Sequence, residues 1–131
     1  MRRLLAILLC TLTMAAWAAL PPLSDDDRKD VADHILVGQV HNVSSKEVEI
    51  QDGTNFVYAL NFRVDAREKG SLRPGLTLSI SCKQTGQRPQ GWAGPQGQNE
   101  IPREGQKVRV FLRETPEGTF SLLEPNGWEA L

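Results

Sequence analysis

The clearest pattern of hydrophobic and polar positions lies in the middle of the chain. Apolar residues occupy every second position from Phe56 to Val64, and polar residues such as Asn61 and Arg63 lie between them. Because successive side chains of a strand point to opposite faces, this period of two predicts a half-buried strand. The residues expected to face the core are Phe56, Tyr58, Leu60, Phe62 and Val64.

Weaker alternation before this strand predicts a hairpin. Residues 34–43 alternate loosely, and Gly38 among them indicates a β-bulge or a close backbone approach. Residues 44–46 are expected to turn the chain into a short strand over residues 48–50. The following Asp52-Gly53 pair predicts a type I′ turn, since both central positions of that turn have positive φ.

The second half of the chain predicts further short strands. Residues 66–70 fit one helical turn, and Arg73-Pro74-Gly75 returns the chain into a strand over residues 76–83. The stretch 84–105 is rich in Gly, Pro and Gln without any period, which indicates a long loop. The remaining elements are a strand through Val108, Val110 and Leu112, a turn at Thr115-Pro116-Glu117-Gly118, a strand that begins with Phe120 and Leu122, and a stop at Pro125-Asn126-Gly127.

Together these elements predict an all-β fold. Ser24 with Asp27 three residues later resembles a capping box, so a short helix is expected to run as far as Asp33. About five to six strands joined by hairpin turns favour a small antiparallel OB-like β-barrel with a short N-terminal helix. The chain divides into a signal peptide (1–18), a lead with the short helix (19–33) and a β-barrel domain (34–131) with its long loop at 84–105.

The first residues have the pattern of a secretory signal peptide. Arg2-Arg3 forms a charged start, residues 4–14 are apolar, and Ala16-Trp17-Ala18 offers small residues at both positions that cleavage requires. We expect cleavage after Ala18 and a secreted or periplasmic location. A retained N-terminal anchor is the alternative, because residues 20–23 extend the hydrophobic stretch.

The charge of the chain argues against a nucleic-acid partner. There are 15 basic and 16 acidic residues, and cleavage would leave 13 basic residues and a net charge of −3. A mildly acidic protein has no general basic field that attracts phosphates. Basic residues around the loop and the strand after it are interpreted as a solvated outer face: Lys83, Arg88, Arg103, Lys107, Arg109 and Arg113.

The cysteine and histidine content argues against a disulfide, a metal site and nucleophilic catalysis. Cleavage would leave Cys82 as the single cysteine, which excludes an internal disulfide. Cys82 lies in phase with Ile80, so we expect it to be buried on the inner face of a strand. His34 and His41 are the other zinc-ligand candidates, and in a single strand they point to opposite faces unless a bulge at Gly38 resets the alternation. We therefore expect no metal, no cofactor and no catalysis.

The chain resembles netrin-like modules in several short segments. The segments are residues 35–40 with their glycine, residues 56–64 running into Glu68-Lys69-Gly70, Gly75, and residues 105–112. Netrin-like modules are secreted OB-fold barrels that include tissue inhibitors of metalloproteinases, so the resemblance implies a secreted OB-fold barrel. These inhibitors use an N-terminal cysteine on the protease zinc and hold their barrel with disulfides. A chain that keeps only Cys82 departs from that pattern, so the inhibitory mechanism is not implied.

Two segments with tryptophan supply the candidate binding residues. Residues 91–95 and 124–128 resemble a group of uncharacterised secreted bacterial single-domain proteins with such a barrel, which implies location and fold but no activity. The pattern Pro-x-Gly-Trp ends at Trp92 and again at Trp128. Each ring directly follows a turn, which suits a plug in an open barrel end, the favoured interpretation, or a recognition contact. The candidate partner-binding residues are Arg88, Trp92, Arg103 and Trp128.

The sequence thus favours a non-catalytic binding or structural module that acts outside the cytoplasm. We expect a protein partner, no nucleic acid and no stable membrane insertion once the signal peptide is removed. Two alternatives remain. One is a protease-inhibitor-like protein that docks through loop 84–105, and the other is a small extracytoplasmic enzyme whose site follows no recognised motif.

The signal-peptide interpretation gives a first prediction. The exported protein should begin at Ala19, because only cleavage after Ala18 places small residues at both required positions. Mass analysis of the N-terminal peptide of exported protein measures this directly. Exported protein that still carries Met1 would instead support the retained anchor.

Overall fold

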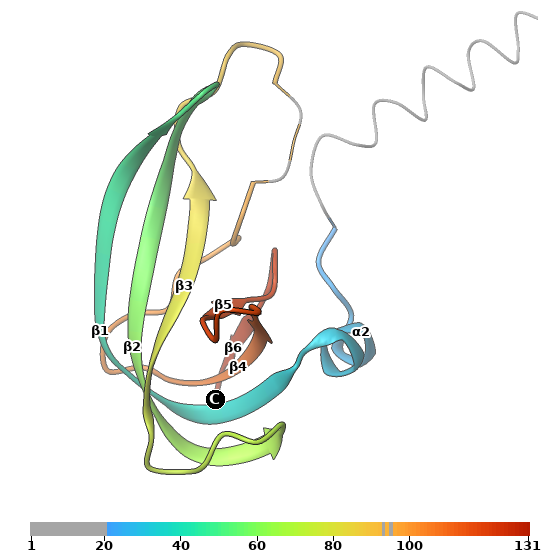
Figure 1. Ribbon diagram of the computed structural model, residues 1–131. Coiled ribbons are helices and arrows are strands. Elements are labelled where there is room, and N and C mark those ends of the chain that lie inside the picture. Colours follow the sequence, from blue (N-terminus) through green and yellow to red (C-terminus); the bar gives the residue numbers. More distant parts are fainter. Residues whose placement is uncertain (1–20, 93, 95) are drawn as a thin grey trace, which may run out of the picture.

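The computed structural model describes residues 21–131 except Ala93 and Pro95, so the expected signal peptide, 1–18, lies outside the described residues. The described chain is mostly β, with one short helix (Figure 1). Its elements are α2 (Asp25–Val31), β1 (His34–Ile50), β2 (Gly53–Lys69), β3 (Thr77–Thr85), β4 (Lys107–Glu114), β5 (Phe120–Leu122) and β6 (Trp128–Ala130).

The strands form one mixed sheet that closes into a ring. Their order is β1-β2-β3-β5-β4-β6, and β1 also pairs with β4. Most neighbours are antiparallel, but β3 and β5 are parallel through Ile80 with Phe120 and Ser81 with Ser121. The expectation of an entirely antiparallel sheet is therefore wrong. Since β4 runs opposite to β3, the hairpin that leads from β4 into β5 turns β5 back to the direction of β3.

β1 and β2 are longer and more continuous than predicted. Residues 44–46 do not turn, because they pair with Ala59, Tyr58 and Val57 inside one ladder that runs from Ile35 to Ile50. Residues 66–70 do not form a helical turn either, since Ala66 and Arg67 pair with β1. In both places the partner strand supplies backbone hydrogen bonds that override the weak local preference for a turn.

The close backbone approach predicted at Gly38 is confirmed, whereas the bulge lies on the partner strand β2. Val37 pairs with Ala66 and Gly38 with Val64, so the extra residue at this register shift is Asp65, and β1 pairs with both β2 and β4 here. A Cβ atom on Gly38 would overlap the Arg63 carbonyl oxygen and would lie 2.7 Å from Cζ of Phe62. Glycine is thus required here because β2 leaves no space for a side chain.

The β1–β2 hairpin is confirmed, but its turn is not type I′. Ile50 pairs with Gly53, so the turn residues are Gln51 and Asp52, and no described non-glycine residue has positive φ. Gly53 has φ 140° and lies against the backbone of Gln87. The amide of Thr54 donates to the Gln87 carbonyl at 3.0 Å, so a distant loop is bonded to the strand directly after the turn.

The main apolar core fills the inside of the ring. Its fully buried residues include Leu36, Leu60, Phe62, Ile80 and Val110. Phe56 was expected in this core, but it is 39% exposed, and Tyr58 is only partly buried against the cluster. Both lie toward the end of the β1–β2 hairpin, where β1, β2 and β3 extend beyond β4, β5 and β6 (Figure 1).

Helix α2 covers part of the outer face of the ring. Its N-cap Ser24 accepts a hydrogen bond from the Asp27 amide at 3.1 Å, as the sequence predicts, and the helix ends at Val31. Ala32, which follows it, joins a second apolar cluster with Ile35, Phe111 and Leu123. A further strand, β6, follows the predicted stop at residues 125–127 and pairs with β4.

A chain of ion pairs joins α2 to the sheet. Arg28 is 6% exposed, and its guanidinium lies 4.4 Å from the centre of the Phe111 ring and 3.1 Å from the Glu129 carboxylate. Glu129 also binds Arg109 at 2.7 Å, and Arg109 in turn binds Glu68. The buried cation is thus paired with carboxylates, which the burial of a charge requires, and it also stacks on an aromatic ring.

The close approach at Gly38 gives a second prediction. Gly38→Ala should lower the free energy of unfolding by about 2 to 3 kcal/mol, because the new methyl group must displace the backbone of β2. Gly105→Ala is the control, since Gly105 has φ 81° with open space around it, so only its conformational cost of about 1 kcal/mol applies. Chemical denaturation of both variants gives the comparison, and equal losses would contradict the close approach.

Candidate interaction site

The long loop after β3 begins with a tight turn at the end of the β1–β2 hairpin. The Trp92 amide donates to the Pro89 carbonyl at 3.1 Å, and Gly91 between them has φ 80°. Positive φ at the third position is typical of a type II turn that starts at proline. This turn carries the first of the two Pro-x-Gly-Trp patterns.

Arg88 and Trp92 stack on each other at this turn. The guanidinium carbon of Arg88 lies 4.8 Å from the centre of the Trp92 ring. The same guanidinium donates to the Thr54 carbonyl and to Oδ1 of Asn55, which fixes it on the start of β2. We call Arg88 and Trp92, with Thr54 and Asn55 beneath them, the tip platform. Its geometry is set by one arginine that bonds to the hairpin on one side and stacks on the ring on the other.

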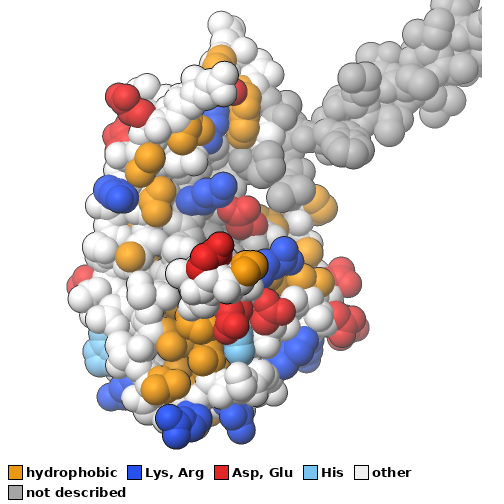
Figure 2. Space-filling view, in the orientation of Figure 1, with side chains coloured by type: hydrophobic (Ala, Val, Ile, Leu, Met, Phe, Trp, Pro, Cys, Tyr) orange, Lys and Arg blue, Asp and Glu red, His pale blue; other side chains and the backbone are white. Residues whose placement is uncertain are grey.

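The tip platform stands at the least packed end of the sheet. Trp92 is half-buried and belongs to neither apolar cluster. Ile50 and Phe56, at the same end, are 40% and 39% exposed. Figure 2 shows apolar side chains at this upper end, on the face in view. Exposed apolar groups gathered at one end of a molecule are typical of an interaction surface.

The second Pro-x-Gly-Trp pattern is built into the wall of the ring. Trp128 is partly buried against the main core, and its Nε1 donates to the Glu100 carbonyl at 2.9 Å. Gly127 leaves no space for a side chain, since an added Cβ would lie 2.6 Å from the Leu123 amide. Trp128 therefore has the place of a plug, whereas Trp92 does not.

The other basic candidates do not join the tip platform. Arg103 is exposed in the connection that leads into β4. Hydrogen bonds to Glu68 and then to Glu129 raise the pKa of Arg109 above its ordinary value. The guanidinium of Arg109 is therefore bound to two carboxylates of the sheet. Of the predicted site residues, the structure thus brings Arg88 and Trp92 together. Their partners Thr54 and Asn55 carry no sequence signal beyond their place next to a predicted turn.

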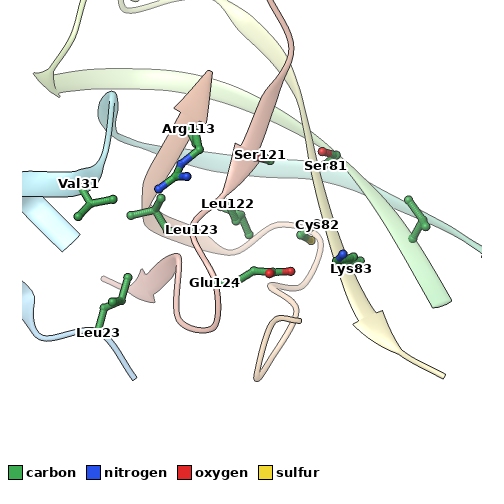
Figure 3. A pocket seen from close by; sticks show the side chains of 11 residues that line it. Leu23, Val31, Ser81, Cys82, Lys83, Arg113, Ser121, Leu122, Leu123 and Glu124 are labelled. Carbon is green, nitrogen blue, oxygen red and sulfur yellow. The ribbon is translucent and has the colours of Figure 1, made fainter. Parts of the chain in front are cut away.

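A separate open groove lies between β3, β5, the end of α2 and the chain before α2 (Figure 3). Its volume is about 600 Å³. Leu23, Val31 and Leu123 form apolar walls, and Lys83 and Arg113 stand at opposite sides of the view. These residues come from four distant segments of the chain, so no sequence pattern could group them.

Cys82 lies at this groove but is not poised as a nucleophile. It is 8% exposed, as its strand phase predicts. Burial, and then the nearby carboxylate of Glu124, raises the pKa of the Cys82 thiol to about 12. A protonated thiol is a poor nucleophile and a poor metal ligand, so the groove offers walls and charges for binding rather than an activated group.

The histidines lie in different surroundings. His34 is buried, with its Nε2 3.1 Å from Oε1 of Glu114, whereas His41 is exposed. Among the residues that the structure describes, no group of three or more His, Cys, Asp or Glu side chains could hold a metal ion.

Comparison with protein-family models, with curated proteins and with solved structures finds no match for this chain. Within the described ranges, none of the helical structure has the length and apolar character needed to span a membrane.

The Cys82 environment gives a third prediction. The wild type should lose stability relative to Cys82→Ala as the pH rises from about 9 toward 12. The sign follows because the folded state raises the thiol pKa. The unfolded thiol, with its ordinary pKa of 9.0, therefore releases its proton first. Urea denaturation of both proteins at about pH 7 and about pH 10 measures the difference. An unchanged difference would show that Cys82 is not buried.

Proposed function

We propose that this chain is a non-catalytic binding module of the extracytoplasmic space and that it recognises a protein partner through the tip platform. The observation that carries the proposal is the stacked Arg88–Trp92 pair, held on the β1–β2 hairpin outside both apolar clusters. Tryptophan and arginine are the side chains most enriched where protein interfaces gain their binding energy.

The fixed geometry of Arg88 supports this role. A long flexible side chain ordinarily loses conformational freedom when a partner binds. The bonds of Arg88 to Thr54 and Asn55, and its stacking on Trp92, order both side chains before any partner arrives. A partner that covers the ring would gain apolar contact without that ordering cost.

The compartment and the finer fold belong to the same proposal. The apolar start of the chain, with Ala16-Trp17-Ala18 after it, supports export and removal of a signal peptide. A sheet closed in a ring, with the close approach at Gly38 of β1, supports an OB-like barrel of the netrin-like kind. A single buried cysteine among residues 19–131 is compatible with an oxidising compartment, because it has no partner with which to form a disulfide.

A fourth prediction tests the tip platform with two matched tryptophan variants. Trp92→Ala should weaken partner binding by roughly 2 kcal/mol or more and leave the unfolding midpoint nearly unchanged. Trp128→Ala should lower the free energy of unfolding by about 3 kcal/mol, because it removes a ring from the core edge. Its binding per folded molecule should stay normal.

The partner can be captured with a photo-crosslinking residue at Gln90, which is exposed in the turn of the tip platform. A crosslinker at Glu117, in the exposed turn between β4 and β5, is the matched control. One protein from the native envelope or secreted fraction should crosslink from position 90, not from 117, and should be lost with Trp92→Ala. Normal binding and stability of the Trp92→Ala variant would overturn the proposed function.

A further inference from the structure

One margin of the sheet has no partner strand in the described part of the chain. β4 pairs with β1 only from His34 to Gln39. Next to it, Val40 exchanges backbone hydrogen bonds with Gly105 and Gln106. Beyond that point, among the described residues, the Glu104 side chain alone hydrogen-bonds to this margin, where its Oε1 accepts from the Val43 amide at 3.1 Å. In Figure 1, the rest of β1 forms the left margin of the sheet, with no described segment beside it.

The open part of β1 presents an ordered row of backbone groups. Because the Val43 amide points to the outer side, the alternation of an antiparallel ladder directs Ser45, Glu47 and Glu49 outward as well. Lys46 and Val48 lie between them and direct their backbone groups to β2. A row of free N–H and C=O groups of this kind is a template for another strand. We call residues 44–50 the open edge.

The charges of the open edge disfavour a second copy of this chain. When a two-fold axis relates two identical antiparallel strands, the axis must pass beside the same residue of each strand. The reason is that residues opposite each other both direct their backbone groups toward the partner strand or both direct them away from it. An axis at Lys46 places the two copies of Lys46 opposite each other, and an axis at Glu47 does the same for Glu47. An axis at Val48 places Glu47 of one copy opposite Glu49 of the other, so all three arrangements bring like charges together. Centring on Ser45 brings the second strand onto the segment that Glu104 and Gln106 already cover.

The same charges define a complementary partner. Glu47 and Glu49 lie on one face of the open edge, while Lys46, Val48 and Ile50 lie on the other face. An antiparallel partner strand therefore matches when it carries two basic residues, at alternate positions, opposite the glutamates. It also needs an acidic residue opposite Lys46 and apolar residues opposite Val48 and Ile50.

We propose that the open edge accepts an extended segment of a partner protein by strand addition, with this alternating charge pattern as its recognition rule. Backbone hydrogen bonds would provide the attachment, and the cross-strand charge pairs would select the segment. The open edge lies on the opposite side of β2 from the loop that carries Trp92, so this proposal does not depend on the tip platform.

The test uses the probe peptide acetyl-Val-Lys-Val-Lys-Glu-Thr-amide, and the charge-reversed peptide acetyl-Val-Glu-Val-Glu-Lys-Thr-amide as its control. Amide hydrogen exchange of the whole chain is followed by NMR with each peptide at millimolar concentration. The first peptide should slow exchange at Ser45, Glu47 and Glu49 at least about fivefold, and the second should not. Lys46 and Val48, already bonded to β2, should stay unchanged.

Two variants complete the test. Glu47→Lys together with Glu49→Lys should exchange the preference between the two peptides, because both side chains are exposed and act only through charge. Glu47→Pro removes one outward N–H while it leaves the bonds to β2, so it should abolish the slowing by either peptide. Unchanged protection of Lys46 and Val48 shows that each variant is folded.

Three results would overturn the proposal. The first is no slowing with the matched peptide, and the second is equal slowing with both peptides. The third is protection of the outward amides that rises with protein concentration in the absence of peptide, which would identify a second copy of the chain as the occupant.

Discussion

The ring depends on the space that Gly38 leaves free. β1 has to pair with β2 along its length and also with β4 over its first residues. Its first residues therefore lie between the two neighbours, and at Gly38 the backbone of β1 lies against the Arg63 carbonyl and the Phe62 ring. Leu36 and Val40, two residues before and after Gly38, both reach the core. The packing inside the ring therefore requires a residue without a side chain at position 38.

The two ends of the molecule differ in how densely they are packed. At the ring end, two apolar clusters and the ion pairs through Arg28 and Glu129 hold the strands together. At the other end β1, β2 and β3 run on as an extension with exposed Phe56 and Ile50. Recognition elements are found where a rigid scaffold supports less packed segments, and both proposed surfaces lie on this extension.

The sequence predicted those features that a local pattern determines. The period of two located the buried Leu60, Phe62 and Val64, and it placed Cys82 on the inner face. It failed for Phe56, because β2 begins outside the core that its later residues help to form. The pattern also gave no signal for β6, whose backbone bonds all go to distant β4. Turn propensity failed for residues 44–46, where the ladder with β2 outweighs the preference of serine for turns.

The two tryptophan turns show why the candidate site could not be read from a motif. Both follow Pro-x-Gly, yet Gly127 is buried and accepts no side chain, whereas Gly91 has open space around it. The surroundings, which come from distant residues, therefore decide whether the ring plugs the core or faces a partner.

At the open edge, the charged side chains determine which strand can pair with it. Lys46, Glu47 and Glu49 are exposed, so they add little to the stability of the fold. A flat edge without them would pair with its own copy and aggregate. Because these charges oppose self-pairing and leave the backbone groups free, the feature that keeps copies of the chain apart is also the one that selects a different strand.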